Sequence, residues 1–144
     1  MRIATWNVNS VRQRLDSLLA WLKERQPDIV CLQEIKCVDA AFPREPLESL
    51  GYNVAVHGQK GFNGVALLSK LPFDEVANGL IGDDGDVQAR FLEALVSTRN
   101  GVLRAVSLYL PNGNGGDEKY SYKLKWMDRL IAFSHERLKL EEPL

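Results

Sequence analysis

The chain has 144 residues, of which 45% are apolar and 26% are charged, with 11 glycines and 6 prolines. These values fit one globular domain and exclude a disordered, fibrous or collagen-like protein. Eighteen Lys and Arg against nineteen Asp and Glu give a net charge of −1, which excludes bulk positive charge as the means of holding nucleic acid. A nucleic-acid enzyme stays open, because a divalent metal and a local basic rim can bind phosphates on a neutral protein.

The sequence also disfavours a membrane protein and a metal site held by cysteine thiolates. No apolar run reaches the roughly 18–20 residues of a membrane span, and no secretory leader opens the chain. The two cysteines, Cys31 and Cys37, lack the CxxC spacing of a zinc site. Cys31 lies in an apolar run and is predicted to be a buried core residue. We therefore expect a soluble cytoplasmic protein.

The chain begins with a β-α pattern. Residues 2–7 are typical of a strand, and Ser10 followed by Gln13 is a capping-box signature. Apolar residues then recur at helical spacing until Pro27, which cannot continue a helix.

A second strand follows at once. The continuous apolar run 29–32 indicates a central strand covered on both faces. A right-handed crossover would make the two strands parallel neighbours, so that both end at the same edge of a sheet. This arrangement predicts that Asn7 and Glu34 lie close together.

The remainder indicates mostly antiparallel strands. A short helix is expected near residues 47–50 and a final helix over about 119–140. Its apolar positions are Leu124, Met127, Leu130, Ile131, Phe133 and Leu138. Asn100-Gly101 is the strongest hairpin signal in the chain. The predicted strands are 52–57, 64–69, 73–78, 91–98 and 102–108. The predicted fold class is α/β, with a mixed β-sheet flanked by helices.

Glu34 and Asn7 are the first candidates for chemistry. A carboxylate where a strand leaves an apolar core suits a hard cation such as Mg²⁺. The alternatives are a solvated strand-end glutamate and an ordinary turn asparagine. Ligands in open α/β sheets favour the carboxyl ends of strands, so two polar side chains at one edge favour a site.

Tyr109 is a further candidate, at the end of another predicted strand, although such a tyrosine can equally be a half-buried aromatic. A set of basic residues could line a phosphate path or simply be solvated. These are Arg90, Arg104, Lys119, Lys123, Lys125 and Arg129. Asp83, Asp84 and Asp86 lack EF-hand spacing, which favours an exposed acidic loop.

Five short motifs together resemble the N-terminal half of the exonuclease III and apurinic/apyrimidinic endonuclease family, within the endonuclease, exonuclease and phosphatase superfamily. The resemblance covers essentially the whole chain. Its motifs are ATWNVN at 4–9, PDIVCLQEIK at 27–36, HGQKG at 57–61, GVALLS at 64–69 and YLPNG at 109–113.

The resemblance implies a four-layered, DNase I-like α/β sandwich and a Mg²⁺-dependent phosphodiesterase, with Mn²⁺ as a possible substitute. Its substrate would be double-stranded DNA with abasic sites or 3′ ends, cleaved at abasic sites and shortened from 3′ to 5′. Glu34 and Asn7 would arrange the metal site, and Tyr109 would contact the scissile phosphate region. The implied DNA contacts are Arg90, Asn112 and Lys60.

In the family, a second half supplies a Gly-Asp-x-Asn base and a phosphate-facing histidine. We therefore interpret residues 1–144 as the N-terminal part of such a domain, ending before the second half. Alone it is expected to be inactive, to expose an apolar sheet face and to self-associate. The alternatives are a non-catalytic remnant that binds DNA or a partner, and a superfamily phosphatase.

Overall fold

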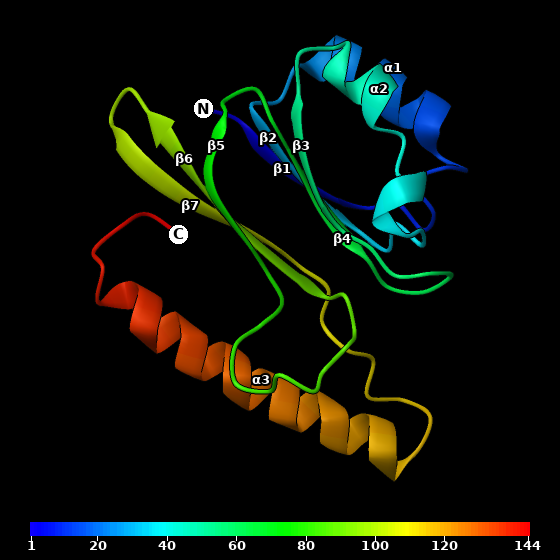
Figure 1. Cartoon of the computed structure of the whole chain (residues 1–144), viewed down its shortest axis with the longest axis vertical. Coiled ribbons are helices and arrows are strands. Elements are labelled where there is room, and N and C mark those ends of the chain that lie inside the picture. Colours follow the sequence, from blue (N-terminus) through cyan, green and yellow to red (C-terminus); the bar gives the residue numbers. More distant parts are fainter.

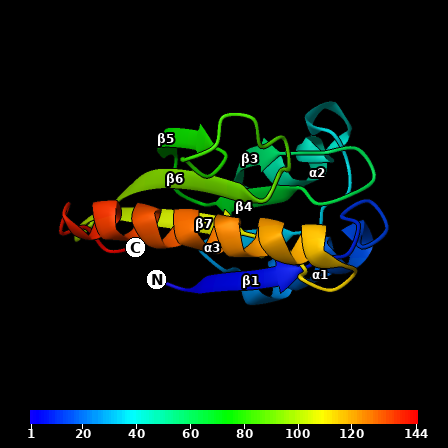
Figure 2. The same cartoon turned by 90° about the horizontal axis from the view of Figure 1, so that it is seen from below.

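Two β-sheets lie face to face between helices, so the 144 described residues form four layers (Figure 1). In this computed structural model, α1 (Leu15–Arg25) and α2 (Arg44–Glu48) cover the first sheet. Helix α3 (Asp117–Leu138) covers the second sheet and runs along it in the view of Figure 2. The predicted fold class is confirmed, with two sheets in place of the single mixed sheet.

The first sheet has the strand order β1-β2-β4-β3. Strands β1 (Ile3–Asn7) and β2 (Ile29–Gln33) are parallel neighbours, as the crossover predicts, and Asn7 is paired with Gln33. Strands β3 (Asn53–His57) and β4 (Val65–Ser69) are antiparallel to each other, and β4 is antiparallel to β2.

The second sheet is an antiparallel meander, β5-β6-β7. Its strands are β5 (Phe73–Asn78), β6 (Phe91–Thr98) and β7 (Gly101–Leu108). Thr98 is paired with Gly101 across a two-residue turn, which confirms the predicted Asn-Gly hairpin.

Alternating side chains of β2 build two separate cores. Val30 and Leu32 pack with the helices α1 and α2, whereas Ile29 and Cys31 pack toward the second sheet. Because successive side chains of a strand point to opposite faces, a run without polar residues is buried on both faces. Cys31 is a free, buried thiol, as predicted.

The expected open inner face is largely covered, contrary to the sequence-based expectation. The second sheet contributes Leu92, Ala94 and Val96 to the core between the sheets, so β2 and β4 are buried on both faces. Strand β1 differs, because the contacts between the sheets fall mainly on the other three strands, and Ile3 is 54% exposed. The part of the inner face that the second sheet leaves uncovered is thus limited to strand β1.

Helix α1 begins later than the capping box indicates. The backbone N–H of Gln13 donates to Ser10 Oγ at 3.4 Å, but the helix starts at Leu15. The Ser10 N–H is already bonded to the carbonyl of Glu34 at 2.8 Å, so the reciprocal half of the box cannot form. Ser10 ties the β1 loop to the β2 loop instead.

Helix α3 buries only part of its predicted apolar set, because Phe133 and Leu130 pack inward and the other four positions do not. Trp126 and Phe133 are buried against the second sheet, whereas Leu124, Ile131 and Leu138 are exposed. The aromatic residues bury more apolar area and decide which face turns inward. No helix of the chain combines the length and apolar character needed to cross a membrane.

Candidate active site

Two polar loops leave the carboxyl ends of β1 and β2 side by side. Four non-glycine residues in these loops have positive φ, namely Asn9 (+42°), Ser10 (+82°), Glu34 (+52°) and Lys36 (+55°). Such backbone is uncommon outside glycine and clusters at functional sites. Hydrogen bonds from Val8, Ser10 and Val11 to the loop after β2 hold the two loops together.

Glu34 is the centre of this loop pair. Asn7 Nδ2 donates to Glu34 Oε1 at 2.9 Å, which confirms that the two predicted residues meet. Lys36 Nζ lies 3.6 Å from Glu34 Oε2 and donates to Asn9 Oδ1 at 2.5 Å. The carboxylate is therefore held at one oxygen by a neutral amide and only loosely paired at the other.

Tyr109 completes the cluster from the second sheet. Burial alone would raise the pKa of Glu34, but hydrogen bonds from Asn7 and Tyr109 and the charge of Lys36 hold that pKa below its ordinary value. Burial and the nearby Glu34 carboxylate raise the pKa of Tyr109. At neutral pH the site thus combines an ionised carboxylate with a protonated phenol.

Polar contacts between the two sheets fix the position of Tyr109. Ser107 Oγ, two residues earlier on β7, donates to the carbonyl of Leu32 at 2.9 Å. Gln33 Nε2 lies 3.4 Å from Ser107 Oγ. Since Ser107 and Gln33 are both buried, these contacts hold the end of β7 over the end of β2.

Arg90 lies directly beside Tyr109, immediately before β6. Its guanidinium carbon is 4.9 Å from the centre of the Tyr109 ring, and Nη1 is 3.3 Å from the Tyr109 carbonyl. Gln88 Oε1 accepts from Arg90 Nε at 2.7 Å. None of the ion pairs of the chain includes Arg90, so its charge is available to an external anion.

A cavity of about 420 Å³ opens on the other side of Arg90. Its lining is mostly polar and comes from the loop after β3, the segment before β6, and the start of α3. The lining residues are Gln59, Phe62, Asn63, Gln88, Arg90, Pro111, Asn112, Glu118, Lys119 and Tyr122.

The other predicted DNA contacts differ in whether they line this cavity. Asn112 lines the cavity, and its Oδ1 accepts the backbone N–H of Asn114 at 2.9 Å. Lys60 is exposed on the loop that carries Gln59 and Asn63, but it is not among the lining residues. Of the other basic residues, Lys119 lines the cavity.

Two of the proposed phosphate-path residues are engaged elsewhere. Arg104 pairs with Glu93 at 2.8 Å, and Arg129 pairs with Asp86 at 2.7 Å. Their inclusion in a phosphate path is therefore wrong for this structure, as is the placing of Asp86 in an exposed acidic loop. The Asp86 side chain is only 6% exposed.

Sequence reasoning missed the neutral residues around Arg90. Gln88 and Tyr122 belong to none of the five motifs, and Gln59 lies in the HGQKG motif at 57–61 but had no predicted role of its own. Gln59 Oε1 accepts the Ala89 N–H at 2.9 Å across 30 positions of sequence. Of these residues, only Gln88 lies in the polar segment directly before β6, and that segment is the one sequence signal that could have indicated it.

The donor set at Glu34 fits a hard divalent cation that also needs substrate oxygens. Mg²⁺ keeps several waters and is usually bound by one or two carboxylates together with phosphate oxygens. Glu34 provides one ionised carboxylate, and the chain contains no cluster of three His, Cys, Asp or Glu side chains. Asn7 Oδ1 accepts the Asn9 N–H at 3.1 Å, so Asn7 orients the carboxylate in this arrangement.

Comparison with known proteins places this geometry in context. Residues 4–144 match the endonuclease/exonuclease/phosphatase family. Exodeoxyribonuclease III of Haemophilus influenzae is 39% identical over 125 residues, which cover 87% of this chain and 47% of that protein.

Solved structures agree with this match. A 3′-5′ exonuclease of Neisseria meningitidis has a TM-score of 0.90 and 35% identity, covering 96% of this chain and 53% of that one. An AP endonuclease of Archaeoglobus fulgidus has a TM-score of 0.83 and 40% identity, covering 90% and 49%. The chain thus spans about half the length of the relatives it matches.

Proposed function

Since the chain belongs to the endonuclease/exonuclease/phosphatase family, we propose that its Asn7, Glu34 and Tyr109 cluster serves a Mg²⁺-dependent DNA-repair nuclease of the exonuclease III and AP endonuclease type. The observation that carries the proposal is the hydrogen-bonded Asn7–Glu34 pair, joined by Tyr109 at the meeting ends of β1, β2 and β7. The proposed reaction is hydrolysis of a phosphodiester in duplex DNA, at abasic sites and from 3′ ends.

Each residue has a distinct proposed task. Glu34 holds the cation, Asn7 keeps the carboxylate ionised and oriented, and Tyr109 contacts the scissile phosphate region. When bound, Mg²⁺ would stabilise the negative charge that builds on the phosphoryl oxygens. Arg90 offers a second positive group with no competing carboxylate partner in the chain.

The proposed DNA path runs from this cluster into the neighbouring cavity. Arg90, Asn112 and Lys119 line that cavity, and Lys60 stands on the loop at its rim. Amide and cationic donors of this kind contact the sugar-phosphate backbone and fix the position of a duplex without reading its sequence. This fits a repair enzyme that works on DNA of any sequence.

We propose that residues 1–144 are the N-terminal part of a domain and have little turnover by themselves. The site holds one carboxylate, and no histidine lies among the residues described around it. A general base and an additional phosphate donor each contribute about 10²-fold or more to such reactions.

A cytoplasmic location stays a prediction.

A phosphatase is the second candidate, supported by one comparison. A structure of a 35% identical Neisseria relative is described as a 3′ phosphatase bound to a product DNA hairpin. Removal of a 3′-terminal phosphate uses the same kind of metal and phosphate contacts as cleavage of a diester. A duplex with an abasic site and a 3′-terminal phosphate separates the two activities. A nick at the abasic site shows the nuclease, and release of the 3′ phosphate shows the phosphatase.

Binding of a fluorescent duplex with one abasic-site analogue tests the proposal directly. We expect fluorescence anisotropy to show binding that strengthens with Mg²⁺ and weakens with chelator. Glu34→Ala should remove the metal dependence while the unfolding midpoint changes little. Failure of the chain to bind the duplex would contradict the proposed substrate.

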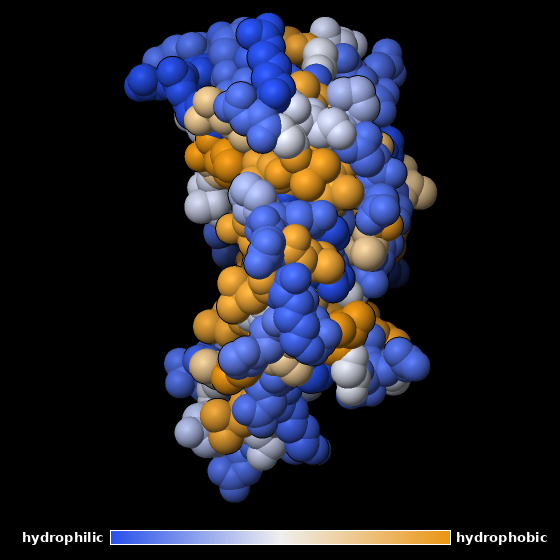
Figure 3. All heavy atoms as spheres, turned by 90° about the vertical axis from the view of Figure 1, so that its left-hand side faces the viewer, coloured by the Kyte–Doolittle hydropathy of each residue, from blue (hydrophilic) through white to orange (hydrophobic).

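We further propose self-association through the uncovered face of β1. Ile3 is exposed there, and Leu140 and Leu144 are exposed apolar residues near the other terminus. Figure 3, which shows the left-hand side of the view in Figure 1, has hydrophobic residues in a band between hydrophilic regions. Light scattering should show oligomers that Ile3→Lys reduces. A monomer at all concentrations would contradict this proposal.

A further inference from the structure

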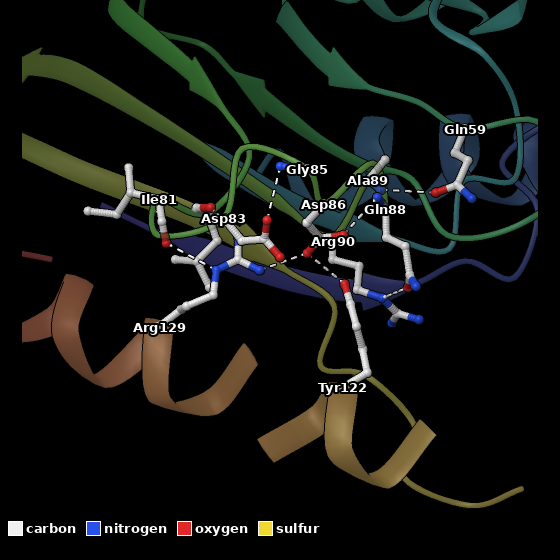
Figure 4. Close-up of polar contacts among 11 residues, drawn as sticks. Gln59, Ile81, Asp83, Gly85, Asp86, Gln88, Ala89, Arg90, Tyr122 and Arg129 are labelled. Atoms are coloured by element: carbon white, nitrogen blue, oxygen red, sulfur yellow. Dashed lines mark hydrogen bonds and ion pairs between the residues drawn. The ribbon is translucent and has the colours of Figure 1, made fainter. Parts of the chain in front are cut away.

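A partly buried polar network connects α3 to the segment that carries Arg90 (Figure 4). Its centre is Asp86, whose Oδ2 accepts from Arg129 Nη1 at 2.7 Å and from the Tyr122 hydroxyl at 2.8 Å. Arg129 and Tyr122 both lie on α3, and the Arg129 side chain is 13% exposed. One carboxylate thus fastens the loop before β6 to the helix.

Arg129 also fastens the beginning of the same loop. Its Nε donates to the Ile81 carbonyl at 3.1 Å, and its Nη2 donates to the Leu80 carbonyl. A Cβ at Gly82 would lie 3.0 Å from Arg129 Cγ, so the loop passes very close to this side chain. The guanidinium therefore holds both ends of the segment between Leu80 and Asp86.

From Asp86 the contacts lead along the loop to Arg90. Asp86 Oδ1 accepts the Gln88 N–H at 3.1 Å, and the Gln88 side chain then accepts Arg90 Nε at 2.7 Å. The ring of Tyr122 lies 5.9 Å from the Arg90 guanidinium carbon. The carboxylate and the arginine are hence neighbours of the same tyrosine, yet they form no ion pair.

We propose that Arg129 and Tyr122 are positioning residues for Arg90, which rests on the proposed function. By binding the Asp86 carboxylate, they fix Gln88 and keep this carboxylate from pairing with Arg90. The Arg90 charge is then left for a DNA phosphate beside Tyr109. A positive residue on α3 thus acts on DNA binding without touching DNA.

Arg129→Met is the direct test, measured by anisotropy on the abasic-site duplex over a range of salt concentrations. Loss of one phosphate contact lowers the slope of log K against log salt by about 0.9. We expect this loss for Arg129→Met and for Arg90→Ala, with no further loss in the double variant. Additive losses would show that Arg129 contacts DNA itself and would overturn the proposal.

A rescue variant separates charge competition from general damage. Adding Asp86→Asn to Arg129→Met removes the carboxylate that would otherwise pair with Arg90, so we expect the salt slope to recover. An unrecovered slope, with a folded protein by circular dichroism, would contradict the competition. The matched control is Arg137→Met, which breaks an ion pair of the same helix with Glu93 and should leave the slope unchanged.

A readout without DNA distinguishes this inference from the proposed function. Arg90 Nε–H is bonded to Gln88, so its side-chain NMR signal should exchange slowly in the wild type and in Arg137→Met. We expect it to broaden or vanish in Arg129→Met. A persistent signal in Arg129→Met would overturn the positioning role, whereas failure of the wild-type chain to bind DNA would overturn the proposed function alone.

Discussion

Glu34 and Glu93 are two carboxylates with lowered pKa values in opposite settings. The Glu93 side chain is 5% exposed and is held by two arginines, Arg104 at 2.8 Å and Arg137 at 2.6 Å. The Glu34 side chain is 22% exposed, with an amide at 2.9 Å and one lysine at 3.6 Å. Two arginines neutralise Glu93, whereas Glu34 is partly exposed and faces a single, more distant cation.

The difference shows how a carboxylate can be ionised for structure or for binding. Arginine forks satisfy most acceptor sites of Glu93, which fastens β6 and β7 to α3. Neutral hydrogen bonds keep Glu34 ionised without cancelling its charge. A lowered pKa alone does not distinguish a structural carboxylate from a binding one. The type and number of the partners of the carboxylate do.

The largest expected effect follows from removing Glu93. Glu93→Ala leaves Arg104 and Arg137 without their shared partner in a largely buried place. We expect the free energy of unfolding to fall by about 3 kcal/mol, as measured by urea denaturation. A loss below about 1 kcal/mol would mean that Glu142, which also pairs with Arg104 at 2.8 Å, compensates.

The same site predicts a pH dependence. Burial would raise the pKa of Glu93, but hydrogen bonds from Arg137 and Arg104 lower it below its ordinary value of 4.5. Its stabilisation is therefore present above that value and is lost as the pH falls through the lower pKa of the folded state. Glu93→Gln should lose less stability than the wild type over this acid range. Equal losses of stability in Glu93→Gln and in the wild type would show that Glu93 does not cause the acid sensitivity.

Substitutions at Glu34 should affect metal binding more than folding. With Mn²⁺ as a paramagnetic probe, Asn7→Ala should weaken binding by about tenfold, as for other residues that orient a ligand. Glu34→Ala should weaken it further. Urea midpoints within the error of the wild type would confirm that the effect is local, and unchanged Mn²⁺ affinity would remove Glu34 from the metal site.

The smallest expected effect is that of Lys36→Met. A partly exposed pair at 3.6 Å contributes less than about 1 kcal/mol, so stability should hardly change. Arg104→Met, the matched change at Glu93, should cost several times more. Similar losses for the two variants in urea denaturation would contradict the contrast between the carboxylates.

Much of this arrangement could be predicted from the sequence because it depends on local patterns. Strand β2 is a continuous apolar run, Asn100-Gly101 marks the hairpin, and a parallel β-α-β unit necessarily brings Asn7 to Glu34. The family resemblance then implied the roles that are proposed for them. These features follow from neighbouring residues and from the handedness of a single crossover.

What the sequence could not provide depends on which distant groups become partners. Asp86 looks like part of an acidic loop until Arg129, 43 positions away, is placed beside it. Leu124 and Ile131 look like core positions, as Phe133 does, until Trp126 joins Phe133 on the face of α3 that packs inward. Burial and pairing of this kind are decided by tertiary packing, which local spacing does not record.

The meander of the second sheet joins strands that follow one another directly, whereas β1 pairs with β2 across an entire helix. Closing the short β6-β7 turn costs less chain entropy than closing the β1-β2 connection. We expect the hairpin to form first, and pulsed amide exchange should show its protection preceding that of β1. The edge strand that carries Asn7 would then be added late in folding, so the proposed metal site would become complete only after the core between the sheets has formed.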